Sequence, residues 1–261
     1  MGFNFADDEL MLSSSTMDAL KSFYAERDTH AQQFAKLLAD TKRPFTEEQP
    51  LTMDAFTEDW NESQFWYSDE TATLLAGQLL DGVTEDSTIA VVSAPSVFVA
   101  LKNLLASESR RGQPRPKLVL LEHDERFAIF PEFVFYDFMH PVRLPAHLKG
   151  TVDRVICDPP FLNEDCQTKV ALTIRWLSRP PTTTTTAAAA PSAAEPVDFR
   201  IISCTGERME ALVTRLYRAF GLRTTDYEPV HARCLNNEFY CYANFECDRW
   251  RWVAAAAPPP E

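Results

Sequence analysis

Short apolar runs alternate with amphipathic segments over most of the chain, from residue 61 to residue 250. The apolar runs have the length and the β-branched or aromatic content of buried strands; they span 89–92, 117–121, 133–136, 152–157 and 199–204. Segments with helical spacing fall between several of them, at 96–106, 164–177 and 207–220. Strands that alternate with helices predict an α/β domain with a mostly parallel sheet covered on both faces.

Both ends of this region add information about the topology. A further helix precedes the first strand, because Ser68 is a typical N-cap, Asp69 and Glu70 suit the first turn, and Gly82 suits the end. At the other end, the strand-like runs 224–230 and 238–246 follow each other without a helix between them. They predict an antiparallel hairpin at the edge of the sheet.

The remaining segments differ in composition from this domain. Residues 1–60 contain an amphipathic helix from Ser15 or Thr16 to about Asp40, followed by a linker with prolines and acidic residues, and we expect them to form a separate helical extension. Residues 179–197 are rich in threonine, alanine and proline, which cannot build a core, and 251–261 are similar. We therefore predict a main domain over 61–250 with a disordered insertion at 179–197 and a disordered tail at 251–261.

The net charge indicates the class of partner, and the cysteines indicate the cellular compartment. The net charge of −13 argues against a surface that neutralises phosphates, so nucleic acid is not the expected partner and a basic protein is favoured. The six cysteines form no C-x-x-C pair and no zinc-like spacing with histidine, so we expect reduced thiols, no metal site, and a cytoplasmic or nuclear protein. No apolar stretch approaches the roughly 20 residues needed to cross a membrane.

Polar residues follow four predicted strands at their carboxyl ends, where open α/β sheets bind ligands. The turn 93–96 follows the first strand without the glycines common there, so it is either a ligand-binding turn or an ordinary turn capped by Ser93 or Ser96. Glu122 follows the second strand and could grip a ribose diol, whereas Asp124 could equally cap the short helix 125–130. Asp137 follows the third strand, where it could accept a hydrogen bond from an adenine amino group or could simply form a turn.

The fourth strand ends in Asp158-Pro159-Pro160-Phe161. Two prolines end a strand sharply and fix the backbone. They leave the Asp158 carboxylate and the Pro159 carbonyl as hydrogen-bond acceptors beside an aromatic ring. The alternative is that the tetrapeptide is a rigid turn with only a structural role.

This tetrapeptide resembles the [D/N]-P-P-[Y/F] motif of seven-strand class I methyltransferases that act on amino nitrogens, a motif first associated with N6-adenine enzymes. Other blocks look like those of the eukaryotic enzymes that methylate a lysine of translation elongation factor 1-alpha. These blocks lie in that family's order at 64–68, 92–96, 122–127, 135–138 and 237–239. The resemblance covers roughly residues 60 to 247, apart from the Thr/Ala-rich insertion.

The resemblance implies a doubly wound, Rossmann-like seven-strand sheet whose last strand is antiparallel, with S-adenosylmethionine as cofactor. The cofactor would lie over Ser93, Ala94, Pro95 and Ser96, with Glu122 on the ribose, Asp137 near the adenine and Asp158 beside the methyl group. The 64–71 block would close over the methionine end, which makes Ser68 and Thr71 candidate contacts. Trp66 and Tyr67 are either substrate-binding residues or packing aromatics.

For the chemistry, we expect Asp158, Pro159, Pro160 and Phe161 to form the catalytic motif. The Asp158 carboxylate and the Pro159 carbonyl would orient a lysine amine, while the Phe161 ring lines the channel and favours the approaching cation. The same acceptors could hold an adenine amino group of DNA or RNA. Charge and the flanking blocks favour lysine on a protein, with elongation factor 1-alpha implied as the substrate; a binding module without chemistry is a third alternative.

Overall fold

In a computed structural model, the described residues are 50–56, 58, 64–180, 199–233 and 238–253, with six isolated positions nearer the amino terminus. Those six are helical: Met17, Asp18, Lys21, Ser22, Thr29 and Gln32. The rest of the predicted helix 15–40, most of the insertion 179–197 and the tail beyond Val253 lie outside the described residues.

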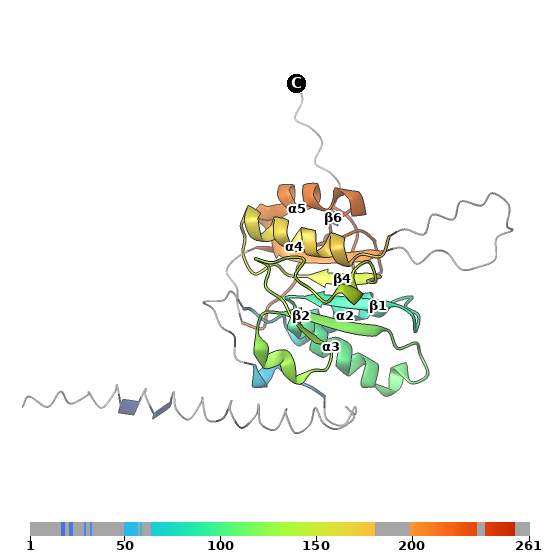
Figure 1. Ribbon diagram of the computed structural model, residues 1–261. Coiled ribbons are helices and arrows are strands. Elements are labelled where there is room, and N and C mark those ends of the chain that lie inside the picture. Colours follow the sequence, from blue (N-terminus) through green and yellow to red (C-terminus); the bar gives the residue numbers. More distant parts are fainter. Residues whose placement is uncertain are drawn as a thin grey trace, which may run out of the picture.

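The described strands form a seven-stranded sheet in the order β3-β2-β1-β4-β5-β7-β6 (Figure 1). The first five of these pair in parallel, and β7 runs antiparallel between β5 and β6. The bounds are β1 Thr88–Val92, β2 Lys117–Glu122, β3 Phe133–Phe135, β4 Arg154–Cys157, β5 Arg200–Gly206, β6 Arg223–Thr224 and β7 Phe239–Ala243. This order confirms the predicted α/β fold with an antiparallel last strand.

Strand β6 is much shorter than the predicted run 224–230. After Thr224 the chain leaves the sheet and pairs with the segment that precedes the first described α-helix of the domain, through an isolated bridge between Tyr67 and His231. The Ser68 N–H donates to the Val230 carbonyl at 2.8 Å, and the Ala232 N–H donates to the Trp66 carbonyl at 2.8 Å. Residues 230–232 therefore pair with residues 66–68, and not with the run 238–246 as the local pattern predicted.

Four α-helices are described in the domain: α2 Asp69–Leu80, α3 Pro95–Ala106, α4 Glu164–Leu177 and α5 Glu210–Leu216. Ser68 caps α2 as predicted, since its hydroxyl accepts from the Thr71 N–H at 3.2 Å. The predicted helix 207–220 is interrupted, because the 3₁₀ turns η6 Glu207–Met209 and η7 Arg218–Phe220 flank α5. The other 3₁₀ turns are η1 Met53–Ala55, η3 Glu108–Arg110, η4 Glu125–Ile129 and η5 Ala146–Leu148.

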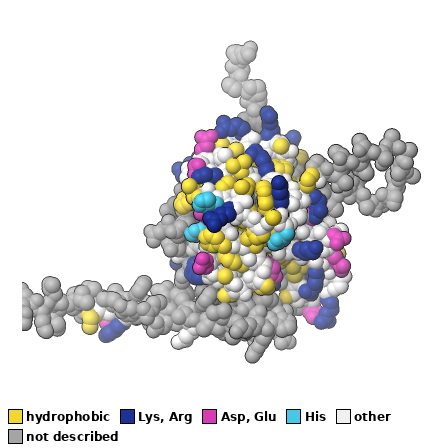
Figure 2. Space-filling model, in the orientation of Figure 1, with side chains coloured by type: hydrophobic (Ala, Val, Ile, Leu, Met, Phe, Trp, Pro, Cys, Tyr) yellow, Lys and Arg dark blue, Asp and Glu magenta, His cyan; other side chains and the backbone are white. Residues whose placement is uncertain are grey.

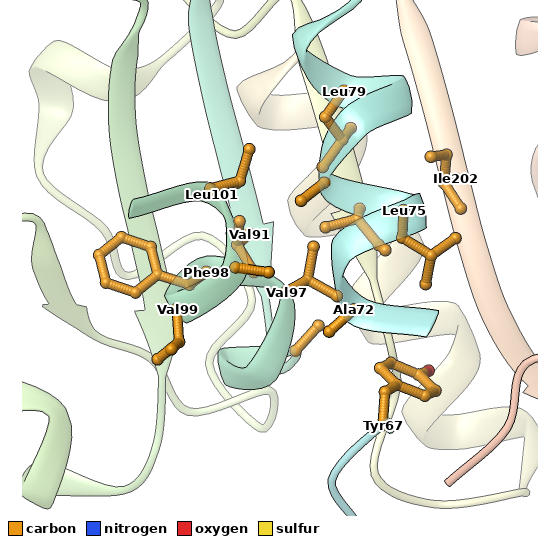
Figure 3. Close-up of a cluster of buried hydrophobic side chains, with 14 of the residues drawn as sticks. Tyr67, Ala72, Leu75, Leu79, Val91, Val97, Phe98, Val99, Leu101 and Ile202 are labelled. Carbon is orange, nitrogen blue, oxygen red and sulfur yellow. The ribbon is translucent and has the colours of Figure 1, made fainter. Parts of the chain in front are cut away.

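The core has two layers because successive strand residues point to opposite faces of the sheet. In β1, Ile89 and Val91 pack with the residues of α2 and α3, whereas Ala90 and Val92 pack with those of α4 and α5. Figure 3 shows part of the first layer, where Leu75 and Leu79 of α2 lie against the sheet and α3. Tyr67 lies at one end of this layer, just before α2 (Figure 3).

The packed domain extends beyond the predicted boundaries at 61 and 250. Upstream, Leu51 is buried and its backbone exchanges two hydrogen bonds with the Asn103 side chain, at 2.8 and 2.9 Å. Phe56 stacks on Phe127 with ring centroids 4.2 Å apart. Downstream, Trp252 bridges to Thr225. Burial of Leu51 and Phe56, which local periodicity does not register, adds the upstream flank to the core, whereas Trp252 is half-buried and extends the domain by its backbone bridge.

Of the helices formed by the described residues, none combines the length and apolar character that crossing a membrane requires. The five described cysteines are free thiols, and four of them are buried. The face seen in Figure 2 has hydrophobic side chains gathered in its middle, with Lys and Arg side chains around them, although the chain as a whole is acidic.

Candidate active site

The site lies where the strand order changes direction, between β1 and β4. Connections leave these neighbouring strands toward opposite edges of the sheet, which opens a crevice at their carboxyl ends. The Asp158 N–H donates to the Val92 carbonyl at 3.0 Å, and the Ser93 N–H donates to the Leu121 carbonyl at 2.9 Å. These bonds bring the ends of β1, β2 and β4, and the polar residues that follow them, to one place.

A cavity of about 930 Å³ opens at this place. It has the size of a cofactor-binding or substrate-binding site. The predicted site residues that line it are Trp66, Ser93, Pro95, Glu122, Asp137, Asp158, Pro159, Pro160 and Phe161. The structure therefore brings together residues from the ends of four strands and from the segment before α2.

Asp158 is the central polar group of the cavity. Its Oδ2 atom accepts a hydrogen bond from the Tyr67 hydroxyl at 2.6 Å. Burial raises the pKa of Asp158 to about 8; the Tyr67 bond opposes this rise, and the negative charge of Glu122 adds to it. A carboxyl group with a pKa near neutrality can exchange a proton under physiological conditions.

Glu122 is fixed at the end of β2 and is only 6% exposed. Its Oε1 atom accepts from the His123 N–H at 2.8 Å and from the Asp124 N–H at 3.2 Å. Burial raises the pKa of Glu122 to about 7, although these two backbone bonds lower it. A carboxylate held in one orientation on the cavity wall suits a diol, whose two hydroxyl groups are donors.

The two other acidic candidates have local structural partners. Asp124 caps η4, since its Oδ1 accepts from the Arg126 N–H at 2.9 Å, and its carboxylate also binds the Arg126 guanidinium at 2.6 Å. Asp137 forms the predicted turn, accepting from the Met139 N–H at 2.8 Å and lying 2.9 Å from His140 Nδ1. Both residues nevertheless line the cavity.

An aromatic contact holds the motif residue Phe161, and a glycine accommodates the residue after it. Its ring packs edge-on against Phe138 with centroids 5.7 Å apart. The next residue, Leu162, approaches Gly206 at the end of β5 so closely that a side-chain Cβ there would lie 2.9 Å from Leu162 Cδ1. Gly206 therefore makes room for Leu162, which also lines the cavity.

Five predicted site residues lie behind the cavity wall. Ser68 caps α2, Ala94 precedes α3 as its buried N-cap, and the buried Ser96 accepts from the Tyr67 N–H at 3.3 Å. Thr71 Oγ1 accepts from the Val230 N–H and from the Tyr227 hydroxyl, both at 3.1 Å. Tyr67 is 2% exposed and reaches the site only through its bond to Asp158. The structure gives these residues supporting contacts and does not place them on the cavity.

Trp66 combines packing with a place on the cavity. Its indole N–H donates to the Phe56 carbonyl at 2.8 Å, and its ring meets Phe127 edge-on. It is 7% exposed and lines the cavity. Trp66 therefore packs against its neighbours and also presents part of its surface to the cavity.

Several cavity residues were missed by the sequence reading, among them Gln64, His231 and Phe239. The Gln64 side chain contacts Asp124, the residue that caps η4: its Nε2 donates to Asp124 Oδ2 at 3.1 Å. The His231 ring lies between those of Tyr67 and Phe239, with centroids 5.0 and 4.9 Å apart. Gln64 stands in the 64–68 block and could have been found there, whereas His231 reaches the site only because its segment pairs with residues 66–68. Glu58, Phe65, His123, Arg126, Tyr136, Phe138, Met139, Leu162 and Arg208 complete the lining together with Asp124.

The sequence matches one family and several curated proteins. The model of the family described as probable N6-adenine methyltransferase matches residues 58–247. Protein-lysine N-methyltransferase EFM5 of Saccharomyces cerevisiae is 40% identical over 93% of this chain and 95% of its own. EEF1A lysine methyltransferase 1 is 36% identical in Mus musculus and 33% in Homo sapiens, each over 92% of this chain and 94% of its own. Among solved structures, a SAM-dependent methyltransferase from Aquifex aeolicus has a TM-score of 0.37 and 11% identity, covering 68% of this chain and 89% of its own.

Proposed function

The chain belongs to the methyltransferase family described as probable N6-adenine methyltransferase, and we propose that it methylates a lysine of translation elongation factor 1-alpha. It is an S-adenosylmethionine-dependent protein-lysine N-methyltransferase, like its relatives at 33 to 40% identity. The observation that carries the choice of substrate is the likeness to proteins named EEF1A lysine methyltransferase 1 over 92% of the chain. The methyl-transfer chemistry is supported by the placement of Asp158, Pro159 and Phe161 on the same cavity as Glu122.

The cofactor, S-adenosylmethionine, supplies an electrophilic methyl group on its sulfonium. Residues of this chain fit it: Glu122 would hold the ribose diol, since two backbone amides already fix its carboxylate. Asp137 would accept from the adenine amino group, and Ser93 and Pro95 would line the floor beneath the cofactor. The supporting contacts of Ser68, Thr71, Ala94 and Ser96 would keep this wall in place.

The substrate amine would be received by the motif. A lysine side chain has an unperturbed pKa of about 10.4 and must lose a proton before its nitrogen can attack. The Asp158 carboxylate and the Pro159 carbonyl would accept its N–H groups and aim the nitrogen lone pair at the methyl carbon. The bond from Tyr67 occupies Asp158 Oδ2, which leaves Oδ1 for the amine. The Phe161 ring would stabilise the approaching cation, and Pro160 would keep the turn rigid.

The name of the family supplies a second candidate, methylation of an adenine amino group in DNA or RNA. The same acceptors would serve it, with Phe161 stacked on the base. The net charge of −13 weighs against a nucleic-acid substrate, because binding a phosphate backbone requires clustered cations.

The deciding experiment incubates the protein with tritiated S-adenosylmethionine and purified elongation factor 1-alpha, and separately with a cell extract treated or not treated with nuclease. We expect label on elongation factor 1-alpha, mapped by mass spectrometry to a lysine, and label in the extract that resists nuclease. Label that nuclease removes would instead establish the adenine reaction. Label on another protein only would retain the lysine reaction but reject this substrate.

The proposal includes a cytoplasmic location. The free thiols of the described cysteines support a reducing compartment, the cytoplasm or the nucleus, and a substrate that works in translation favours the cytoplasm. Fractionation of cells that express the tagged full-length chain would test it, and recovery in the nuclear fraction alone would contradict it.

A further inference from the structure

We infer that Tyr67 is a positioning residue for the methyl transfer: its buried hydroxyl group fixes the Asp158 carboxyl group so that one oxygen is presented to the substrate amine. This inference rests on the proposed function, in which Asp158 receives the lysine. Tyr67 is 2% exposed and is not among the residues that line the cavity. It therefore acts through Asp158 and not by touching the substrate.

The geometry of the contact carries the inference. The Tyr67 hydroxyl donates to Asp158 Oδ2 at 2.6 Å, a length typical of an O–H donor on a carboxylate. A carboxyl group without this bond could rotate about its last torsion, so the plane of its two equivalent oxygens would vary. Because the bond holds one oxygen in place, it fixes that plane and therefore the direction in which the other oxygen can accept a hydrogen bond.

Tyr67 is itself held from several sides. Its N–H donates to Ser96 Oγ in the first turn of α3 at 3.3 Å, and its backbone bridges to His231. The two rings of that bridge lie 5.0 Å apart. The next N–H, that of Ser68, donates to the Val230 carbonyl at 2.8 Å. Helix α3 and the 230–232 segment therefore determine where the hydroxyl lies, so the bond to Asp158 is fixed by the fold.

The surrounding charges give the bond a measurable consequence. Burial raises the pKa of Asp158, and the charge of Glu122, which lines the same cavity, adds to this rise, whereas the Tyr67 bond stabilises the carboxylate and lowers that pKa. Burial raises the pKa of Tyr67 well above its usual value, with Asp158 and the Cys204 thiol contributing, so the hydroxyl keeps its proton near neutral pH. The His231 ring also lies beside Tyr67, and burial lowers the pKa of His231, which favours its neutral form. Removal of the hydroxyl should therefore raise the pKa of Asp158.

The test compares Tyr67→Phe with the wild-type protein over a range of pH. We expect kcat for the protein substrate to fall about tenfold or more, the loss of about 1.4 kcal/mol of transition-state stabilisation. The acid limb of the kcat profile should move to higher pH, while the affinity for S-adenosylmethionine measured by calorimetry stays unchanged. Tyr217→Phe is the matched control, because Tyr217 is equally buried and its hydroxyl lies 3.7 Å from Cys157 Sγ, one residue before Asp158.

A second variant keeps the inference testable if Tyr67→Phe folds poorly. Site-specific replacement of Tyr67 by 3,5-difluorotyrosine retains the ring and makes the hydroxyl a stronger donor, so the acid limb should move to lower pH. An unchanged kcat and an unchanged acid limb in either variant would overturn the inference alone. A wild-type protein that methylates no lysine would overturn the proposed function first, and this inference with it.

Discussion

At the scale of single residues, the site depends on a few side chains whose environment changes their chemistry. Asp158 and Glu122 are both buried enough for their pKa values to rise to about 8 and about 7. Perturbed carboxyl groups of this kind concentrate where proteins do chemistry. Ser93 is unusual in a different way, because its φ of 54° is the conformation that glycine normally adopts.

Replacement of Asp158 by alanine should separate binding from transfer. The cofactor dissociation constant is expected to stay near the wild-type value, because Glu122 and Asp137 would still grip the nucleoside. kcat should fall on the order of 100-fold, since a preorganised acceptor for the amine is lost. Calorimetry and a filter-binding assay with tritiated cofactor measure the two effects. Asp86→Ala is the control, because Asp86 is an exposed acid at the opposite end of β1. Equal loss of binding and transfer in Asp158→Ala would show that the role of Asp158 is misassigned.

Ser93→Gly should stabilise the protein. A left-handed backbone costs a residue with a side chain about 1–2 kcal/mol, and glycine avoids most of this cost, so the free energy of unfolding should rise by about 1 kcal/mol. Ser93→Ala keeps the strain and should bring no such gain. Urea denaturation of both variants checks the difference. A Ser93→Gly protein less stable than Ser93→Ala would mean that the serine hydroxyl, and not the backbone, decides stability there.

At the scale of elements, the wall behind the site is built by two segments that meet far from each other in sequence. The 66–68 segment pairs with 230–232, and Thr71 ties α2 to the same region through the Val230 N–H and the Tyr227 hydroxyl. This explains why β6 stops at Thr224 instead of continuing as predicted. It also explains how Tyr67 is brought to Asp158.

Thr71→Val tests this contact. Valine has nearly the same shape but cannot accept a hydrogen bond, so the Val230 N–H and the Tyr227 hydroxyl lose a partly buried acceptor, at a cost of about 1 kcal/mol in unfolding free energy. Thr71→Ser keeps the hydroxyl and should stay close to wild type. Thermal and urea denaturation report the difference. Equal stability of the valine and serine variants would indicate that the hydrogen bonds of Thr71 do not contribute to the free energy of unfolding and that only its packing does.

At the scale of the whole molecule, the two perturbed carboxyl groups link stability to pH. A buried acid with a raised pKa holds a proton at a pH where the unfolded chain has already lost it. Their burial therefore costs little near pH 4, costs more as the pH rises, and reaches its full cost above about pH 8. The cofactor-free protein carries this cost to keep two carboxylates in the cavity.

Asp158→Asn should reveal this linkage. The amide can still accept the Tyr67 bond but carries no charge, so the variant should be more stable than wild type, and its advantage should grow from pH 6 to pH 8.5 and then level off. Melting temperatures of the cofactor-free proteins across this range measure it. An advantage that stays constant, or that shrinks as the pH rises, would show that Asp158 is not the group that titrates there.

The sequence by itself determined the α/β class, the antiparallel end of the sheet and the strand-end positions of Ser93, Glu122, Asp137 and Asp158. Strand and helix periodicities and proline stops are local properties, and carboxyl ends of parallel strands must share one edge. Only the tertiary structure decided that Tyr67, Ser68, Thr71, Ala94 and Ser96 support the wall, that His231 joins the cavity, and that residues 51–56 complete the core. Several of those outcomes depend on contacts between residues 66–68 and residues 230–232, which are far apart in the chain, and the free energy of such contacts is not encoded in either segment alone.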